Sequence, residues 1–393
     1  MENRIKKTTL TFNKRKTTVL TGAFWTSGQR KGNNLHEIAY RACFKPALPQ
    51  YFISRYSSIN DVIYDPFCGR GTTVIEAALY GRNVIANDVN PISTILAEGR
   101  LFVPEISALE LRLDFIFSLP EVAPGKNHKL TMFYHRETYK QLLKLRNWLF
   151  TRTTNGELDA LDKWIRMVAT NRLTGHSPGF FSVYTLPPNQ AVSRDRQILI
   201  NKNRNQKPTF RDVKLLIIKK SKSLLKDLDE ATSKNVLHAS KKALFLQRDA
   251  AATAQIKRNS VQLTITSPPF LDIVQYAKDN WLRCWFNCIN MDDIAKKITM
   301  SKTIEEWIIK MQSVFNELYR ITKKDGFLVF ETGEVHHGKT RLEPHVLQMG
   351  LNAGFTCEHI IINEQQFTKT ANIWGIKNNV NGTNSNRIVV FKK

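Results

Sequence analysis

The stretch DPFCGRGTT, at residues 65–73, decides the fold that this sequence predicts. It follows a short apolar run at residues 62–64 and precedes a helix-like run at residues 74–79, which gives the order strand, glycine turn, helix. Gly69 and Gly71 permit positive φ and let a ligand approach the backbone near the positive end of the helix. The stretch therefore predicts the first strand and the ligand-binding turn of a parallel α/β sheet.

A second apolar run, at residues 83–86, ends at Asn87 and Asp88. This acid stands about 20 residues after the glycine turn, where an acid at the tip of the second strand of a Rossmann-like unit accepts hydrogen bonds from ribose hydroxyls. The spacing predicts a nucleoside site. The alternative is a tight turn followed by a solvated Asp88.

Residues 266–270, Thr-Ser-Pro-Pro-Phe, directly follow the apolar run at residues 261–265. They fit the problem of methylating an aromatic amine, whose nitrogen is a poor nucleophile because its lone pair is delocalised into the ring. The Ser267 hydroxyl and a backbone carbonyl held by two prolines are able to accept its two N–H bonds, and Phe270 is able to stack on a base taken out of a helix. The alternative is a strand followed by an ordinary Pro-Pro turn.

Together the two motifs resemble those of the exocyclic-amino DNA methyltransferases that use S-adenosylmethionine. Residues 65–73 look like their cofactor motif, and Ser-Pro-Pro-Phe looks like the catalytic motif of the N4-cytosine branch. The adenine-N6 branch usually carries Asp or Asn at the position of Ser267. The resemblance implies that the glycine turn faces the methionine part of the cofactor, with Asp65 near its amino group and Asp88 on the ribose. It also implies that Asp249, after a strand-like run, meets the adenine.

The resemblance implies two groups of site residues and no metal. The catalytic residues are Ser267, Pro268, Pro269 and Phe270. The cofactor-binding residues are Asp65, Pro66, Phe67, Gly69, Gly71, Thr72, Asp88 and Asp249. Residues 45–53 are similar to the helix that precedes the first strand in these enzymes. His36 lacks the proline that usually follows it, so we assign His36 no cofactor contact.

The C-terminal third continues the alternation of helices and strands. Helical apolar spacing at residues 304–321 is followed by a β-rich run at residues 327–330 and a helix-like segment at residues 344–352. Two further strands, at residues 355–362 and 387–391, are expected to pair as a hairpin edge. The predicted fold class is therefore α/β, with a Rossmann-like class I methyltransferase sheet.

An insertion separates the two motifs, because they stand about twice as far apart as a compact Rossmann-like domain needs. We expect a mainly helical and basic target-recognition region at residues 104–243, inside a catalytic domain built from residues 21–103 and 244–393 and preceded by a basic tail at residues 1–20. Within the insertion, residues 176–190 mix aromatic rings, turn formers and amides, which suits either contact with bases or a packed loop.

The charge of the chain predicts a polyanionic partner. The sequence has 58 Lys and Arg against 34 Asp and Glu, a net charge of +24 and a pI near 9.9. Residues 194–226 alone carry eleven basic residues against two Asp, a composition typical of phosphate binding, although a charge run is usually a solvated helix face. The DNA-binding candidates are Arg194, Arg196, Lys202, Arg204, Lys214, Lys219, Lys220 and Lys222.

The five cysteines include no Cys-x-x-Cys pair, so the sequence predicts neither a disulfide framework nor a zinc site. Cytosine C5 methylation is disfavoured, because its thiolate nucleophile conventionally stands in a Pro-Cys pair and the sequence has none. The sequence contains no run of about 18 apolar residues, and its basic first residues lack a signal-peptide core. We therefore expect a cytoplasmic protein that binds no membrane.

The expected function is site-specific methylation of the N4 amine of a flipped cytosine in double-stranded DNA, by an enzyme that is the modification partner of a restriction endonuclease. Three alternatives remain open: an adenine-N6 DNA methyltransferase, an RNA amino-group methyltransferase and a non-catalytic DNA-binding regulator. Ser267 counts against the first two, because both usually carry Asp or Asn before Pro-Pro. The intact glycine and Pro-Pro turns count against the third.

Overall fold

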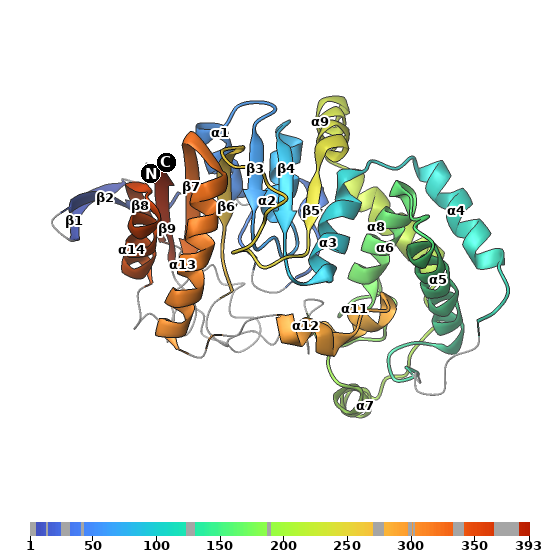
Figure 1. The fold of residues 1–393 in the computed structure, drawn as a ribbon. Helices are drawn as coiled ribbons and strands as arrows, with labels where there is room; N and C mark the ends of the chain where they lie inside the picture. Colours follow the sequence, from blue (N-terminus) through green and yellow to red (C-terminus); the bar gives the residue numbers. More distant parts are fainter. Residues whose placement is uncertain are drawn as a thin grey trace.

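The computed structural model describes residues 5–12, 15–24, 32–40, 43–122, 130–186, 190–269, 279–297, 301, 303–332, 342–364 and 385–393. Within them a nine-stranded sheet has the order β1-β2-β8-β9-β7-β6-β3-β4-β5. Helices cover the sheet, and a further group of helices stands beyond its β5 end (Figure 1). The predicted α/β fold class is confirmed.

Five parallel strands form the half of the sheet that ends at β5. They are β3 (Val62–Asp65), β4 (Asn83–Asn87), β5 (Leu244–Leu246), β6 (Val261–Thr266) and β7 (Thr322–Thr332). From β3 the chain builds toward β4 and β5 on one side, and then returns to build β6 and β7 on the other side. Ligands of open α/β sheets bind at the carboxyl ends of the strands where the order reverses in this way.

The other half of the sheet differs in part from the expectation. β9 (Ser385–Lys392) runs antiparallel to β7 and to β8 (Thr356–Glu364), as the expected hairpin pairing requires. The basic tail expected at residues 1–20 instead contains β1 (Lys6–Phe12) and most of β2 (Arg15–Gly22), and β2 pairs parallel with β8. The Thr and Val side chains of this segment favour an extended strand, and its positive charge does not oppose strand formation.

The helices that cover the sheet belong to two apolar clusters. α13 and α14 share one cluster with β7 and β9, whereas α1, α2 and α9 share the other with the helices beyond β5. The bounds are α1 (Ala47–Tyr56), α2 (Thr72–Leu79), α3 (Pro91–Glu98), α9 (Glu230–Lys242), α13 (Ile304–Ile321) and α14 (Glu343–Ala353). Asn235 Nδ2 donates to the Leu79 carbonyl at 3.0 Å, so α9 packs on α2 although it lies inside the expected insertion.

The segment expected as an insertion connects β4 to β5 and is mainly helical (Figure 1). Its other helices are α4 (Ile106–Ser118), α5 (Arg136–Thr154), α6 (Ala160–Arg172), α7 (Arg194–Asn203) and α8 (Val213–Leu225), and the later helices α11 (Trp281–Phe286) and α12 (Met291–Lys297) lie near them. No helix in the described ranges is long and apolar enough to cross a membrane.

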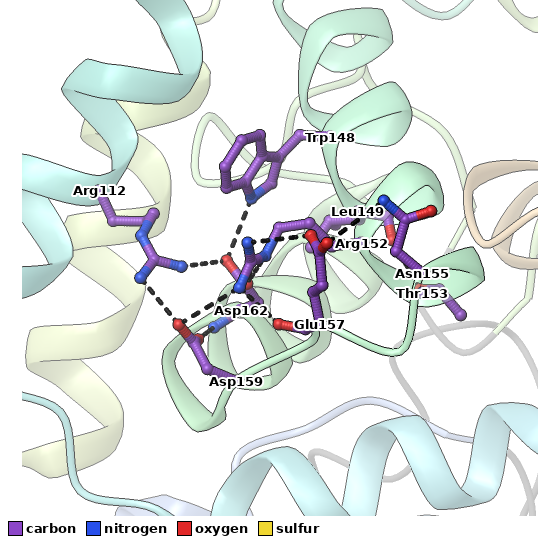
Figure 2. Close-up of polar contacts among 9 residues, drawn as sticks. All are labelled: Arg112, Trp148, Leu149, Arg152, Thr153, Asn155, Glu157, Asp159 and Asp162. Atoms are coloured by element: carbon purple, nitrogen blue, oxygen red, sulfur yellow. Dashed lines mark hydrogen bonds and ion pairs between the residues drawn. The ribbon is translucent and has the colours of Figure 1, made fainter.

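A buried carboxylate joins α4, α5 and α6 (Figure 2). Asp162 is fully buried, and it accepts hydrogen bonds from Arg112 at 2.6 Å and from Arg152 at 2.5 Å. Trp148 Nε1 donates to the same carboxylate at 3.1 Å, and Arg112 also contacts Asp159 at 2.8 Å. This network ties the three helices together.

Candidate active site

The carboxyl ends of the parallel strands lie on the lower side of Figure 1 and bring the two sequence motifs together. Asp65 ends β3, and Thr266 ends β6. The Thr266 hydroxyl donates to Asp65 Oδ1 at 2.7 Å, although the two residues are 201 positions apart in the chain. A side-chain hydrogen bond thus joins the expected cofactor motif to the expected catalytic motif.

The glycine turn has the conformation that its sequence predicts, with φ of 52° at Gly69 and 83° at Gly71. A Cβ on Gly71 would lie 2.7 Å from the Cβ of Ala97, so glycine is needed here for packing as well as for φ. A Cβ on Gly69 would lie 3.7 Å from the Tyr40 ring, an ordinary contact, so the backbone conformation alone requires this glycine.

Asp88 fastens the glycine turn to the end of β4. Its Oδ2 accepts the Gly69 N–H at 2.9 Å, and its Oδ1 accepts the Asn90 N–H at 2.9 Å. Burial raises the pKa of the Asp88 carboxyl above its ordinary value, and the two N–H donors oppose that rise. The Ser93 hydroxyl is a third hydrogen-bond donor that opposes the rise. Two carboxylate oxygens have about four acceptor positions, so Asp88 keeps acceptor capacity for a ribose hydroxyl.

Asp65 is buried beneath the turn. Besides the Thr266 hydroxyl, the Phe67 N–H donates to its Oδ1 at 3.1 Å. Burial raises the pKa of Asp65 to about 7, and no cationic side chain in the described part of the chain forms an ion pair with it. A buried acid without a counter-charge is costly to a fold. A cofactor with a sulfonium and an ammonium group supplies positive charge, so these residues fit S-adenosylmethionine.

Ser267 contacts a buried carboxyl that sequence reasoning missed. Glu331, near the end of β7, is buried, and its carboxyl accepts a hydrogen bond from the Ser267 hydroxyl. Asn386 Nδ2 donates to Glu331 Oε1 at 2.7 Å. Burial raises the pKa of Glu331, and these two hydrogen bonds oppose the rise. The signal in the sequence was an acid directly after the apolar run at residues 327–330.

The carbonyls of Pro268 and Pro269 differ in their hydrogen bonding. Trp307 Nε1 donates to the Pro269 carbonyl at 3.2 Å. No hydrogen bond to the Pro268 carbonyl is made by a donor among the described residues, so of the two oxygens this one is the candidate acceptor for a target amine. Phe270 lies outside the described residues.

The segment before α1 contacts the glycine turn. The sequence did not indicate this contact. Arg70 donates to the Ile38 carbonyl at 3.0 Å, which draws this segment over the glycine turn. The Tyr40 hydroxyl accepts a hydrogen bond from Asn90 Nδ2 at 3.2 Å, and its ring lies near Gly69. Tyr40 is therefore positioned beside the turn that the cofactor is expected to face.

The remaining candidates make contacts within the protein. Thr72 Oγ1 accepts from Arg70 Nε at 3.1 Å. Asp249 is exposed beyond the end of β5 and accepts a backbone N–H two residues on at 3.0 Å. His36, to which we assigned no cofactor contact, places Nε2 2.6 Å from Glu76 Oε2, and burial lowers the pKa of its imidazole.

The basic candidates divide between two helices with different surroundings. On α8, three lysines contact acids: Lys214 with Asp114, Lys220 with Glu37 at 3.1 Å, and Lys222 with Glu110 at 4.0 Å. Lys219 is exposed. On α7, Arg194, Arg196 and Lys202 are exposed, and Arg204 follows the helix.

The aromatic loop at residues 176–190 is packed in its middle. Phe180 and Phe181 are both buried, and the Arg172 guanidinium lies 4.1 Å from the centre of the Phe180 ring. Of the two interpretations of this loop, the packed one therefore describes these rings.

Comparison with known proteins shows which proteins this chain resembles. Residues 1–95 match a family of N6 and N4 methyltransferases described as DNA methylase. The chain resembles an exocyclic-amino DNA methylase. The type II methyltransferase M.MjaII of Methanocaldococcus jannaschii is 34% identical over 92 residues, which are 23% of this chain and 17% of that protein. M.BsoBI of Geobacillus stearothermophilus is 25% identical over 263 residues, 63% of this chain and 52% of that protein.

The chain thus spans about half of M.BsoBI and less of M.MjaII. Among solved structures, TrmN from Thermus thermophilus is 12% identical, covers 92% of this chain and 51% of its own, and gives a TM-score of 0.33. The fold assignment therefore rests on the strand order described above. The family match confirms the resemblance to the exocyclic-amino DNA methyltransferases and supports S-adenosylmethionine as the cofactor.

Proposed function

We propose that this protein transfers a methyl group from S-adenosylmethionine to the N4 amine of a cytosine that is flipped out of duplex DNA. The observation that carries the proposal is the pair of acceptors after β6. These are the Ser267 hydroxyl, held by Glu331, and the Pro268 carbonyl, which has no donor among the described residues. They stand directly after Thr266, which contacts the buried acid of the glycine turn, Asp65.

When bound, the cofactor supplies an electrophilic methyl group on a positively charged sulfur. The part of the protein is to prepare the amine. Ser267 Oγ and the Pro268 carbonyl accept its two N–H bonds and draw the nitrogen toward sp³ geometry, which returns the lone pair from the ring. Methyl transfer leaves a positive charge on that nitrogen. The nitrogen then loses a proton to Ser267 Oγ while Ser267 passes its own proton to Glu331, whose raised pKa suits it to receive one.

Ser267 favours cytosine over adenine, because the hydroxyl stands where the adenine-N6 branch usually carries Asp or Asn. The expected insertion, residues 104–243, is proposed as the target-recognition region. The type II methyltransferases that the chain resembles support a modification enzyme with a restriction endonuclease as its partner. No observation favours RNA as the substrate or a purely regulatory role.

The test is to incubate the purified protein with mixed-sequence duplex DNA and methyl-labelled S-adenosylmethionine, and to identify labelled nucleosides by mass spectrometry. The proposal expects N4-methylcytosine, formed about a hundredfold more slowly by Ser267→Ala under the same conditions. N6-methyladenine as the product would overturn the base assignment. Labelled RNA nucleosides in a parallel RNA incubation, with unlabelled DNA, would overturn DNA as the substrate.

A further inference from the structure

Helix α7 has an inverted distribution of polar and apolar side chains. A surface helix normally turns its apolar residues toward the core and its amides toward water. On α7, Gln197 is fully buried, whereas Ile198 is 52% exposed and Leu199 is 43% exposed. Two adjacent large apolar side chains therefore stand in solvent on a helix whose fully buried residue is an amide, with Ile200 partly buried.

Amide side chains fix this orientation of α7. Gln197 Nε2 donates to the Tyr184 carbonyl at 3.0 Å, and Asn201 Nδ2 donates to the Met132 carbonyl at 2.8 Å. Gln206, just beyond the helix, also donates to the Tyr184 carbonyl, at 2.9 Å. A rotation that buried the apolar pair would break these hydrogen bonds, so the exposure of the pair is built into the fold.

Positive charge surrounds the exposed pair. Arg196 and Lys202 are exposed on α7, Lys207 is exposed shortly after it, and Asp195 is the one acid between residues 194 and 207. On α8, by contrast, three of the four lysine candidates contact acids of the protein itself. The two basic helices thus differ: the charge on α7 faces outward, whereas the charge on α8 is largely compensated.

The segment before α7 contacts the start of α11, which comes after the catalytic turn in the chain. The residues that lead into α7 bind the segment that follows that turn: Ala191 N–H donates to the Asp279 carbonyl at 2.9 Å, and Trp281 Nε1 donates to the Val192 carbonyl at 3.0 Å. Figure 1 places α7 on the lower side of the molecule, toward which the carboxyl ends of the parallel strands point.

We propose that α7 is the helix that contacts duplex DNA beside the target base. Its basic side chains neutralise phosphates, and Ile198 with Leu199 packs against base edges or between base steps, where apolar wedges help to unstack DNA. This inference rests on DNA as the substrate of the proposed function. The argument for a nucleic acid as the occupant is the charge of the helix together with its connection to the segment after the catalytic turn.

The test compares three triple variants that remove the same charge. Arg196→Gln, Lys202→Gln and Lys207→Gln change α7 and the residues just after it; this is called the α7 variant. Lys214→Gln, Lys219→Gln and Lys222→Gln change α8. Lys234→Gln, Lys241→Gln and Lys242→Gln change α9, which Figure 1 shows on the opposite side of the molecule, as the matched control. The measurement is the slope of log K against log salt concentration for binding to a duplex, with thermal unfolding as the check on folding.

The α7 variant is expected to flatten the slope by about two to three, close to one for each phosphate that is no longer neutralised, and the α9 variant to leave it unchanged. Flattening by the α8 variant with an unchanged α7 slope would overturn the proposal. Loss of binding to anionic lipid vesicles by the α7 variant, with duplex binding intact, would assign α7 to a membrane surface and also overturn it.

The apolar pair has a separate test. Ile198→Ser with Leu199→Ser is expected to weaken duplex binding about tenfold with the salt slope unchanged, because an apolar contact releases no counterions. Unchanged affinity would remove the pair from the interface. These binding measurements need no methyl transfer. Failure of the proposed function would appear as duplex binding through α7 without a methylated nucleoside, whereas failure of this inference would appear as methylation with α7 binding unaffected.

Discussion

Buried carboxylates in two regions of the molecule have different partners. Asp162, in the helical region beyond β5, receives the guanidinium groups of Arg112 and Arg152 (Figure 2). Asp65 and Glu331, at the carboxyl ends of β3 and β7, are also buried. Their donors among the described residues are hydroxyl, amide and backbone N–H groups. Burial raises the pKa of both Asp65 and Glu331.

The difference shows which acid serves the fold and which is available for chemistry. A buried acid that is paired with guanidinium groups has its charge compensated within the protein, so it acts as a structural anchor. A buried acid that is held by neutral donors keeps an uncompensated charge or an exchangeable proton. The carboxyl ends of the parallel strands therefore retain two acids, Asp65 and Glu331, that are able to respond to a cationic ligand or to accept a proton.

The largest expected effect is on stability, at the helical region. Asp162→Asn leaves two guanidinium groups without their buried counter-charge, and we expect a loss of about 2–4 kcal/mol in the free energy of unfolding, measured by urea titration. Both guanidinium groups are partly exposed, which limits the loss. Asp65→Asn is the matched control, and at pH 8 we expect no loss. Equal losses in the two variants would remove the distinction between the regions.

The next effect concerns the catalytic turn. Ser267→Ala removes one of the two acceptors of the amine, and we expect turnover to fall about a hundredfold while the dissociation constant of the cofactor changes little. Asp88→Ala is the complementary variant, with cofactor affinity about tenfold weaker and turnover at saturating cofactor nearly intact. Steady-state kinetics and direct cofactor titration separate the two. Parallel losses in both quantities would contradict the division of roles.

A smaller effect is expected at Glu331, which acts through Ser267. Glu331→Gln keeps an acceptor for the Ser267 hydroxyl but cannot take up a proton, so we expect kcat to fall about tenfold with KM unchanged. In the unmodified protein kcat rises with pH as Glu331 ionises, and the variant loses that limb of the pH–rate profile. Asn386→Ala removes a donor that lowers the pKa of Glu331, so the limb moves to higher pH. An unchanged profile in both variants would restrict Glu331 to a structural role.

The sequence predicted the parts of the site that depend on local order. The strand, turn and helix around Gly69 and Gly71 follow from glycine φ and apolar periodicity, and the strand before Ser267 follows from the run at residues 261–265. Contacts between distant strands were not predictable in this way. Nothing local to Glu331 or Asn386 indicates that β9 returns beside β7, because that pairing depends on the register of the whole sheet.

The same limit applies to charge and to the N-terminal strands. Composition showed that residues 194–226 are basic, but it does not distinguish a lysine that faces solvent from one that contacts Asp114 or Glu110. The pairing of β2 with β8 depends on an open sheet edge that no motif of the first 20 residues indicates.

The central claim is that the carboxyl end of β3 keeps a buried acid, Asp65, whose charge no cation in the described part of the protein compensates and which is available for a cationic cofactor. Because the pKa of Asp65 is raised from 3.8 to about 7, the cofactor-free protein should lose stability as pH rises from about 4 to about 7, since ionising Asp65 opposes folding over that window. A bound cation lowers that pKa, so cofactor binding should release a proton below about pH 7, and affinity should rise with pH and level off above it.

The most direct test is calorimetric titration with S-adenosylmethionine, at several pH values between about 5 and 8, in buffers of different ionisation enthalpy. The account predicts proton release on binding below about pH 7, and a smaller release with weaker binding in Asp65→Asn. Binding that releases no proton, with the same pH-independent affinity in both proteins, would contradict it.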